Sequence, residues 1–171
     1  WGDRLGDAVV LSTVSHQHIY GLLFRLLWPL CAGRPFAALP QQYPEMLMAE
    51  ASQYRRTVLV SSPAQLKRFS PPAPAAGTPT PPVVAVFSSG GPLPLEAAQA
   101  WQSALGHAPL EVLGSTETGG VAWRCQSSPE SPWQPLPGVK LHCPDDDALF
   151  VTSPFTGQPD HALPMGDRAL L

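Results

Sequence analysis

Residues 110–120 read Leu110-Glu111-Val112-Leu113-Gly114-Ser115-Thr116-Glu117-Thr118-Gly119-Gly120, an apolar run followed by a loop rich in glycine and hydroxyl groups. The apolar run predicts a strand that ends at Leu113. Beyond it, free backbone and hydroxyl donors suit a phosphate, and the Glu117 carboxylate suits the magnesium ion that accompanies a phosphate. The same residues could form a turn with a helix N-cap, and this motif alone leaves both interpretations open.

Outward from this loop, strand-like and helix-like segments alternate with short connections, which predicts βαβ units. The expected fold is therefore α/β, with a mostly parallel sheet flanked by helices. The predicted strands cover residues 8–14, 36–39, 57–60, 83–87 and 110–113, and the predicted helices cover 19–30, 43–55, 64–69 and 95–105.

The pattern changes after about residue 120. Short apolar runs at 121–125, 139–142 and 149–152 are separated by turn signals, which predicts an antiparallel or barrel-like set of short strands. We therefore expect an α/β subdomain over residues 1–120 and the start of a small β region over 121–171.

Composition excludes several classes of function. The net charge is −3 and only 13% of residues are charged, so we expect no nucleic-acid partner. The longest apolar run, 22–30, contains Arg25 and is too short to span a bilayer. Three widely separated cysteines without a Cys-x-x-Cys spacing argue against a disulfide framework and a zinc site, and predict a reducing, cytoplasmic location.

Two glycine-rich turns, 88–91 and 114–120, follow predicted parallel strands. Ligands of open α/β sheets bind at the carboxyl ends of the strands, so a nucleotide-like ligand is expected at these two loops. The usual phosphate fingerprints, Gly-x-x-x-x-Gly-Lys-Ser/Thr and Gly-x-Gly-x-x-Gly, do not occur in the sequence.

Four segments in order carry a resemblance to a known family: 14–22, with His18-Ile19-Tyr20-Gly21; 84–94, with Ser89-Gly90-Gly91-Pro92; 114–120; and 165–168, Met-Gly-Asp-Arg. In this order the chain resembles the AMP-forming adenylate ligases, which include acyl- and aryl-CoA synthetases, luciferases and peptide-synthetase adenylation domains. The resemblance covers essentially the whole chain.

The resemblance implies a catalytic set of Thr116, Glu117 and His18. Thr116 would donate its hydroxyl to the α-phosphate of ATP, and Glu117 would hold magnesium between the phosphates. His18 would orient the carboxylate of the acid substrate. A helix-start histidine packed under the sheet is the alternative for His18, and His16 is the rival residue.

The resemblance also implies a set of nucleotide-binding residues. Asp167 would accept hydrogen bonds from the ribose hydroxyls, although it could instead be a turn residue that pairs with Arg168. The loop 89–92 would pack against adenine. The family usually has an aromatic residue at the position of Leu113, which keeps apolar contact but lacks a π-face. The full predicted set is Ser89, Gly90, Gly91, Pro92, Leu113, Gly114, Ser115 and Asp167.

The implied activity is that of an acid–thiol ligase. It converts a carboxylic acid and ATP to an acyl-adenylate, then transfers the acyl group to CoA or to a carrier-protein thiol. The family's phosphate loop ending in Pro-Lys and its C-terminal lysine domain are not in this sequence, so we expect a central fragment, inactive alone, that works with the rest of its polypeptide. A non-catalytic nucleotide-binding or scaffold module is the alternative. A serine hydrolase is disfavoured because no Gly-x-Ser-x-Gly elbow occurs.

Overall fold

The structure is a computed structural model that describes residues 2–69, 71–72, 82–144, 148–169 and 171. Its helical and strand elements follow one another along the chain as η1 Gly2–Arg4, β1 Val9–Ser12, α1 Ile19–Gly21, η2 Leu22–Leu27, α2 Trp28–Cys31, α3 Pro44–Ala51, β2 Thr57–Ser61, α4 Pro63–Arg68, β3 Val83–Ser88, α5 Leu95–Leu105, β4 Leu110–Ser115, β5 Gly119–Cys125, β6 Gln134–Pro135, β7 Lys140–His142, β8 Ala148–Thr152 and β9 Leu163–Arg168.

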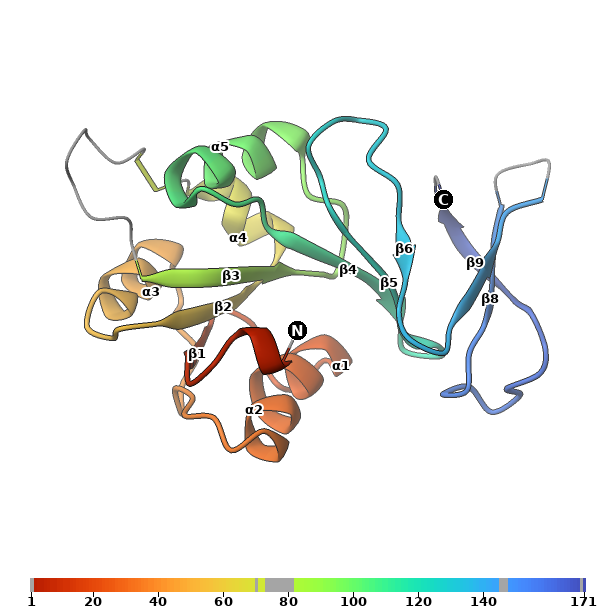
Figure 1. The fold of residues 1–171 in the computed structure, drawn as a ribbon, viewed down its shortest axis with the longest axis horizontal. Helices are drawn as coiled ribbons and strands as arrows, with labels where there is room; N and C mark the ends of the chain where they lie inside the picture. Colours follow the sequence, from red (N-terminus) through yellow and green to blue (C-terminus); the bar gives the residue numbers. More distant parts are fainter. Residues whose placement is uncertain (1, 70, 73–81, 145–147, 170) are drawn as a thin grey trace.

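The first sheet has six strands in the order β1-β2-β3-β4-β5-β6 (Figure 1). β1 to β4 are parallel, whereas β5 and β6 run antiparallel to their neighbours. The predicted α/β fold with a mostly parallel sheet is confirmed. The strand direction reverses at the β4–β5 hairpin, whose turn is the glycine-rich loop.

Both faces of this sheet are buried under helices. Leu59 and Val86 face α3, α4 and α5, while Val60 and Phe87 face α1, η2 and α2. Neighbouring residues of a strand point to opposite faces, so the continuous apolar runs of β2 and β3 fill two separate cores. In Figure 1, α4 and α5 lie above the sheet and α1 and α2 lie below it.

The helix predicted over 19–30 is present, but its middle turn, η2, is π-helical. Arg25 points inward from this turn and is buried. Its guanidinium donates to the Ala38 carbonyl at 2.6 Å and contacts Nδ1 of His16 at 2.9 Å. Burial lowers the pKa of Arg25. The charged residue that interrupts the apolar run is thus an internal anchor for the loop after α2.

Two predicted elements are shorter than expected. The strand predicted over 36–39 is a single bridge between Phe36 and Val10, because prolines at 35 and 40 remove the backbone donors on either side. The helix predicted over 43–55 ends at Ala51, where the Ser52 hydroxyl donates to the Ala49 carbonyl.

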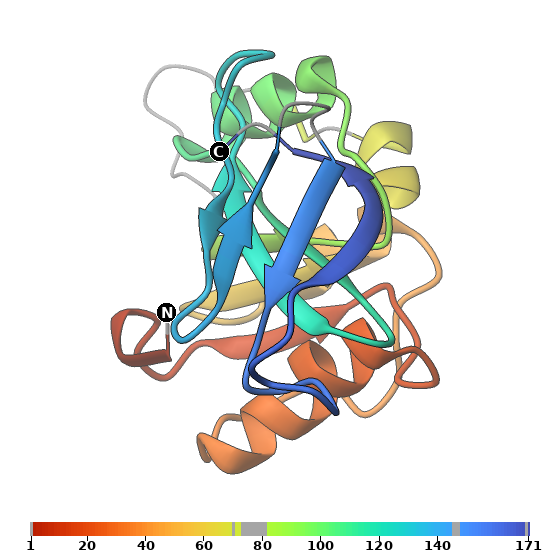
Figure 2. The same cartoon turned by 90° about the vertical axis from the view of Figure 1, so that its right-hand side faces the viewer.

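The second sheet has three antiparallel strands in the order β7-β8-β9, as predicted for the end of the chain. It lies in front of the end of the first sheet in Figure 2. Val121 and Ala122 of β5 pack against Leu149 and Met165, so one apolar cluster joins the two sheets. β5 includes residue 120 and β6 follows it, yet both strands belong to the first sheet. The division of the chain near residue 120 stays a prediction.

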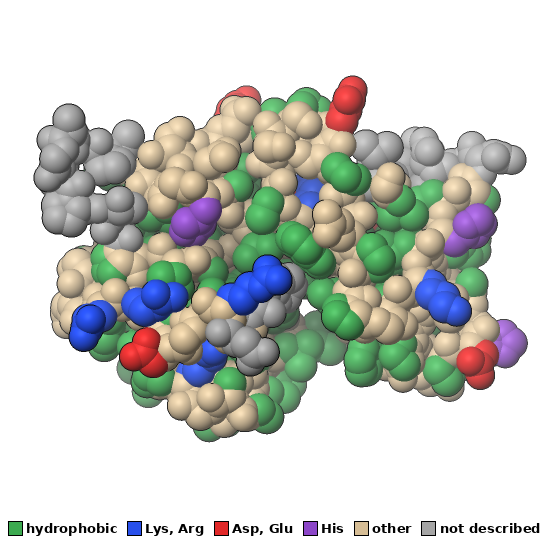
Figure 3. Space-filling model, in the orientation of Figure 1, with side chains coloured by type: hydrophobic (Ala, Val, Ile, Leu, Met, Phe, Trp, Pro, Cys, Tyr) green, Lys and Arg blue, Asp and Glu red, His purple; other side chains and the backbone are tan. Residues whose placement is uncertain are grey.

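The low charge content is visible on the surface. On the face shown in Figure 3, Lys and Arg side chains lie scattered among hydrophobic and uncharged side chains. Within the part of the chain that the structure describes, no helix has the length and apolar character needed to cross a membrane.

Replacing Trp101 by alanine is expected to lower the free energy of unfolding by about 3–5 kcal/mol, because a large side chain leaves the core under α5. Trp101 is 0% exposed and its Nε1 donates to the Leu66 carbonyl at 3.1 Å, so a buried acceptor also loses its partner. Urea denaturation measures the change. Gln102→Ala, one residue along on the exposed face, should change stability by less than about 0.5 kcal/mol.

Candidate functional site

Several cavities adjoin at the carboxyl edge of the parallel strands, and three of them are lined by the predicted site residues. The chain segments around them are the loop after β3, the β4–β5 turn, the start of α1 and strand β9. All predicted site residues that the resemblance implied line at least one of these cavities. The sheet topology therefore brings together residues that lie up to about 150 positions apart in the sequence, although their individual roles stay predictions.

The first cavity has a volume of about 240 Å³ and is mostly apolar. His18 and Thr116 lie at its wall together with Ser89, Gly90 and Gly114. The remainder of its wall consists of side chains from α1 and η2 and of residues from β4 and β5, among them Ile19, Tyr20, Leu23, Phe24 and Val112.

The second and third cavities share Asp167. The second, of about 480 Å³, lies between the loop 89–92 and Leu113, with Arg124 and Trp133 also at its wall. The third, of about 380 Å³, lies between the β4–β5 turn and β9 and includes Ser115 and Glu117. Asp167 sits in strand β9 and is exposed, so the interpretation as a turn residue is wrong.

The β4–β5 turn is closed by its own hydroxyl groups. The Thr118 amide donates to Ser115 Oγ at 3.2 Å, and the two hydroxyl oxygens lie 3.0 Å apart. Thr118 is buried, whereas Thr116 and Glu117 are exposed at the tip. β5 begins at Gly119, so the loop is a hairpin turn and the helix N-cap interpretation is wrong.

Close backbone approach explains the glycine that opens this turn. A Cβ on Gly114 would overlap the carbonyl oxygen of Gly119 across the hairpin. A side chain at this position would therefore separate β4 from β5 and move the tip of the turn.

The Glu117 carboxyl has a pKa below its ordinary value, first because the Ser115 hydroxyl donates to its charged form and second because of a backbone hydrogen bond. It is exposed at the third cavity, so an ionised oxygen faces the space beside Asp167. Oxygen ligands of this kind suit Mg²⁺. No cluster of three or more His, Cys, Asp or Glu side chains with metal-binding geometry occurs among the described residues, so phosphate and water oxygens would have to complete the coordination.

The two candidate histidines differ in their surroundings. His16 is engaged by Arg25 through Nδ1, whereas His18 is exposed at the first turn of α1 and lines the first cavity. A Cβ on Gly21 would overlap the Ser15 carbonyl, so the glycine of His-x-x-Gly lets α1 pack against the loop that carries both histidines. His18, and not His16, is therefore the histidine that lines the first cavity; its role stays a prediction.

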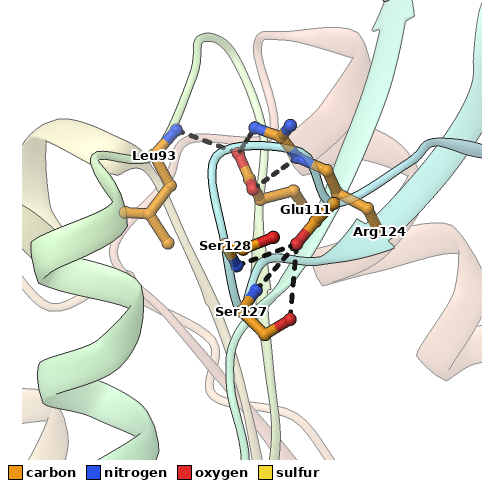
Figure 4. A network of polar contacts seen from close by, with 6 residues as sticks. Leu93, Glu111, Arg124, Ser127 and Ser128 are labelled. Carbon is orange, nitrogen blue, oxygen red and sulfur yellow. Dashed lines mark hydrogen bonds and ion pairs between the residues drawn. The ribbon is translucent and has the colours of Figure 1, made fainter. Parts of the chain in front are cut away.

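Sequence reasoning missed the contacts of the buried Glu111 carboxylate with Arg124 and the Leu93 amide. Figure 4 shows these contacts. Glu111 is 2% exposed; its Oε1 accepts from Arg124 Nε at 2.8 Å and its Oε2 from the Leu93 amide at 2.9 Å. The Arg124 guanidinium lies 4.4 Å from the centre of the Trp133 ring. One signal was available, since Glu111 is an acid within a run that is otherwise apolar.

A profile of the family described as AMP-binding enzyme matches residues 1–158. The chain belongs to this family. The predicted resemblance to the AMP-forming ligases is thereby confirmed. A 4-coumarate–CoA ligase from Cereibacter sphaeroides is 33% identical over 133 residues, which is 76% of this chain and 30% of that protein.

Solved structures of CoA and acid ligases share the fold. A benzoate CoA ligase from Burkholderia xenovorans LB400 has a TM-score of 0.69 at 21% identity, over 86% of this chain and 33% of that one. A mutant form of coronafacic acid ligase from Pectobacterium brasiliense has a TM-score of 0.73 at 17% identity, over 94% and 36%. The chain thus spans about a third of the length of the relatives that it matches.

Replacing Ser115 by alanine should raise the pKa of Glu117 toward its ordinary value, because the charged carboxylate loses its main hydrogen-bond donor. Carbon-detected NMR titration of the Glu117 side-chain carboxyl measures the shift. Ser52→Ala, which removes a hydroxyl at the end of α3, serves as the control. An unchanged titration midpoint in Ser115→Ala would contradict the hydrogen bond.

Proposed function

We propose that the protein containing this chain activates a carboxylic acid with ATP and transfers the resulting acyl group to a thiol, either that of CoA or that of a carrier protein. The observation that carries the proposal is the convergence of His18, Thr116, Glu117 and Asp167 on adjoining cavities in a member of the AMP-binding enzyme family. The similarity to a 4-coumarate–CoA ligase supports the same class of reaction.

In the first step a carboxylate oxygen attacks the α-phosphorus of ATP, and the bond from that phosphorus to the bridging oxygen of pyrophosphate breaks. His18 orients the acid, and the Thr116 hydroxyl donates to an α-phosphate oxygen as negative charge develops there. In the second step a thiolate attacks the acyl carbon and AMP leaves with the electrons of the C–O bond.

The third cavity supplies the negative side of the site. Glu117 would hold a magnesium ion, which when bound screens the charge on the phosphates. Asp167 lies in strand β9, and its exposed carboxylate faces both the second and third cavities. There it accepts hydrogen bonds from the ribose hydroxyls.

The first cavity suits the body of the acid. Ile19, Tyr20, Leu23 and Phe24 give it an apolar wall, and among the described residues that line it His18 is the one ionisable side chain other than the Tyr20 phenol. An acid with a second charge would lose hydration there without gaining a partner. We therefore propose an aryl or medium-length acyl acid as the substrate.

The rest of the polypeptide supplies positive charge in this proposal. Among the described residues that line the three cavities there is no lysine, and Arg124 is already paired with Glu111. The triphosphate therefore needs cationic groups from outside this chain, and the isolated chain should not catalyse the reaction.

Glu117→Gln in the complete polypeptide should reduce acid-dependent pyrophosphate exchange on the order of 10²–10³-fold, since a preorganised charge at the phosphates is lost while shape is kept. Glu130→Gln, which neutralises an exposed acid outside the cavities, should exchange at the normal rate. Full exchange in the Glu117 variant would remove its role. No exchange in the unaltered protein with any aryl or acyl acid would favour the non-catalytic alternative.

Asp167→Ala should weaken the binding of ATP by about 2–4 kcal/mol, because hydrogen bonds to a charged group contribute roughly 1.5–3 kcal/mol each and are not additive. The deciding comparison uses 2′,3′-dideoxy-ATP, which should bind poorly to the unaltered protein yet almost as well as ATP to the variant. Asp160→Ala is the matched control, since Asp160 is exposed and lines none of the cavities described. Equal discrimination of the two nucleotides by both proteins would exclude Asp167 from the ribose site.

A further inference from the structure

The second cavity contains a planar surface that no predicted site residue provides. Its walls include the backbone of Gly90 and Gly91 and the aliphatic side chain of Leu113. Among the described residues around it, Trp133 is the one aromatic side chain and Arg124 the one guanidinium. A nucleotide base gains most from a π-face or a guanidinium plane on which to stack, and Leu113 offers neither.

We propose that Trp133, together with the Arg124 guanidinium stacked on it, is the surface on which the nucleotide base lies. The inference rests on the proposed function, since it places the base of ATP or AMP in the second cavity. Asp167 also lines this cavity, so a base on the stacked Arg124 and Trp133 side chains and a ribose beside Asp167 lie in one continuous space.

The tryptophan is held by its apolar packing and by the Arg124 guanidinium over its ring, and it lines the cavity. It is half-buried, packs against the apolar cluster that joins the two sheets, and reaches the cavity from the segment just before β6. An indole anchored in this way loses little conformational freedom when a base stacks on it.

Arg124 is fixed just as firmly. Its Nε donates to Glu111 Oε1 at 2.8 Å and its Nη2 lies 3.4 Å from Oε2, so the guanidinium plane has a set direction over the indole. The same carboxylate accepts the Leu93 amide, which follows the loop 89–92. Glu111 thus connects Arg124 to the Leu93 amide (Figure 4). Arg124, Trp133 and the glycine loop all line the second cavity.

The test separates the base from the rest of the nucleotide. In the complete polypeptide, calorimetry compares the affinities of AMP and ribose 5-phosphate for the unaltered protein, Trp133→Leu and Trp133→Phe. Trp133→Leu should lower the affinity for AMP about tenfold, within the range measured for the loss of one stacked base. It should change the affinity for ribose 5-phosphate less than twofold. Trp133→Phe keeps a ring and should recover most of the AMP affinity.

Trp123→Leu is the matched control, because Trp123 is a half-buried tryptophan on β5 that lines none of the cavities described. It should leave both affinities unchanged. If Trp133→Leu loses affinity for AMP and for ribose 5-phosphate equally, the effect is a general structural one and the inference is overturned. An affinity of Trp133→Leu for AMP within twofold of that of the unaltered protein also overturns it.

A second measurement needs no variant. Hydroxyl-radical footprinting of the unaltered protein should show protection of Trp133 by AMP and not by ribose 5-phosphate; no difference between the two ligands overturns the inference. The proposed function can fail independently of this inference: it is wrong if AMP binds but no acid supports pyrophosphate exchange. In that case the AMP comparison still decides the role of Trp133.

Discussion

The buried carboxylate of Glu111 is the constraint on which the arrangement of the site depends. A buried carboxylate is stabilised only when its oxygens are paired. Glu111, at 2% exposure, has both oxygens paired, one with Arg124 and one with the Leu93 amide. Removal of Arg124 alone would leave a buried charge without compensation, a change that typically costs about 3–5 kcal/mol. The pairing therefore fixes the loop after β3 and the guanidinium at the second cavity at the same time.

The position of the site follows from the change of strand direction at β4. The parallel strands β1 to β4 bring their carboxyl ends to one edge, and the hairpin into β5 then returns the chain across that edge. Because Gly114 has no side chain, the two strands approach closely at the turn, and Thr116 and Glu117 stay exposed at its tip. A hydroxyl donor and a carboxylate are thus exposed at the tip of the hairpin, where the proposed ligand would meet them.

Local patterns in the sequence predicted the elements that are buried on both faces and α5, whose bounds, Leu95–Leu105, match the prediction. They did not predict β6, which has two residues and ends in proline, or β9, which contains Pro164 and Gly166; their strand conformation comes from their neighbours. The site residues came from a family resemblance, which points to ligand contacts. Glu111 and Trp133 were missed because their partners are fixed by tertiary packing and not by sequence spacing.

The residues proposed to bind the nucleotide come from both sheets. The glycine loop, Arg124 and Glu117 belong to the first sheet or its turns, whereas Asp167 comes from β9 of the second. The apolar cluster of Val121, Leu149 and Met165 joins the sheet that carries Asp167 to the first sheet. Apolar packing is non-directional but dense, so it fixes the separation of the sheets while it leaves the carboxylates free for a ligand. A nucleotide that touches both sheets would then add its binding free energy to the same interface.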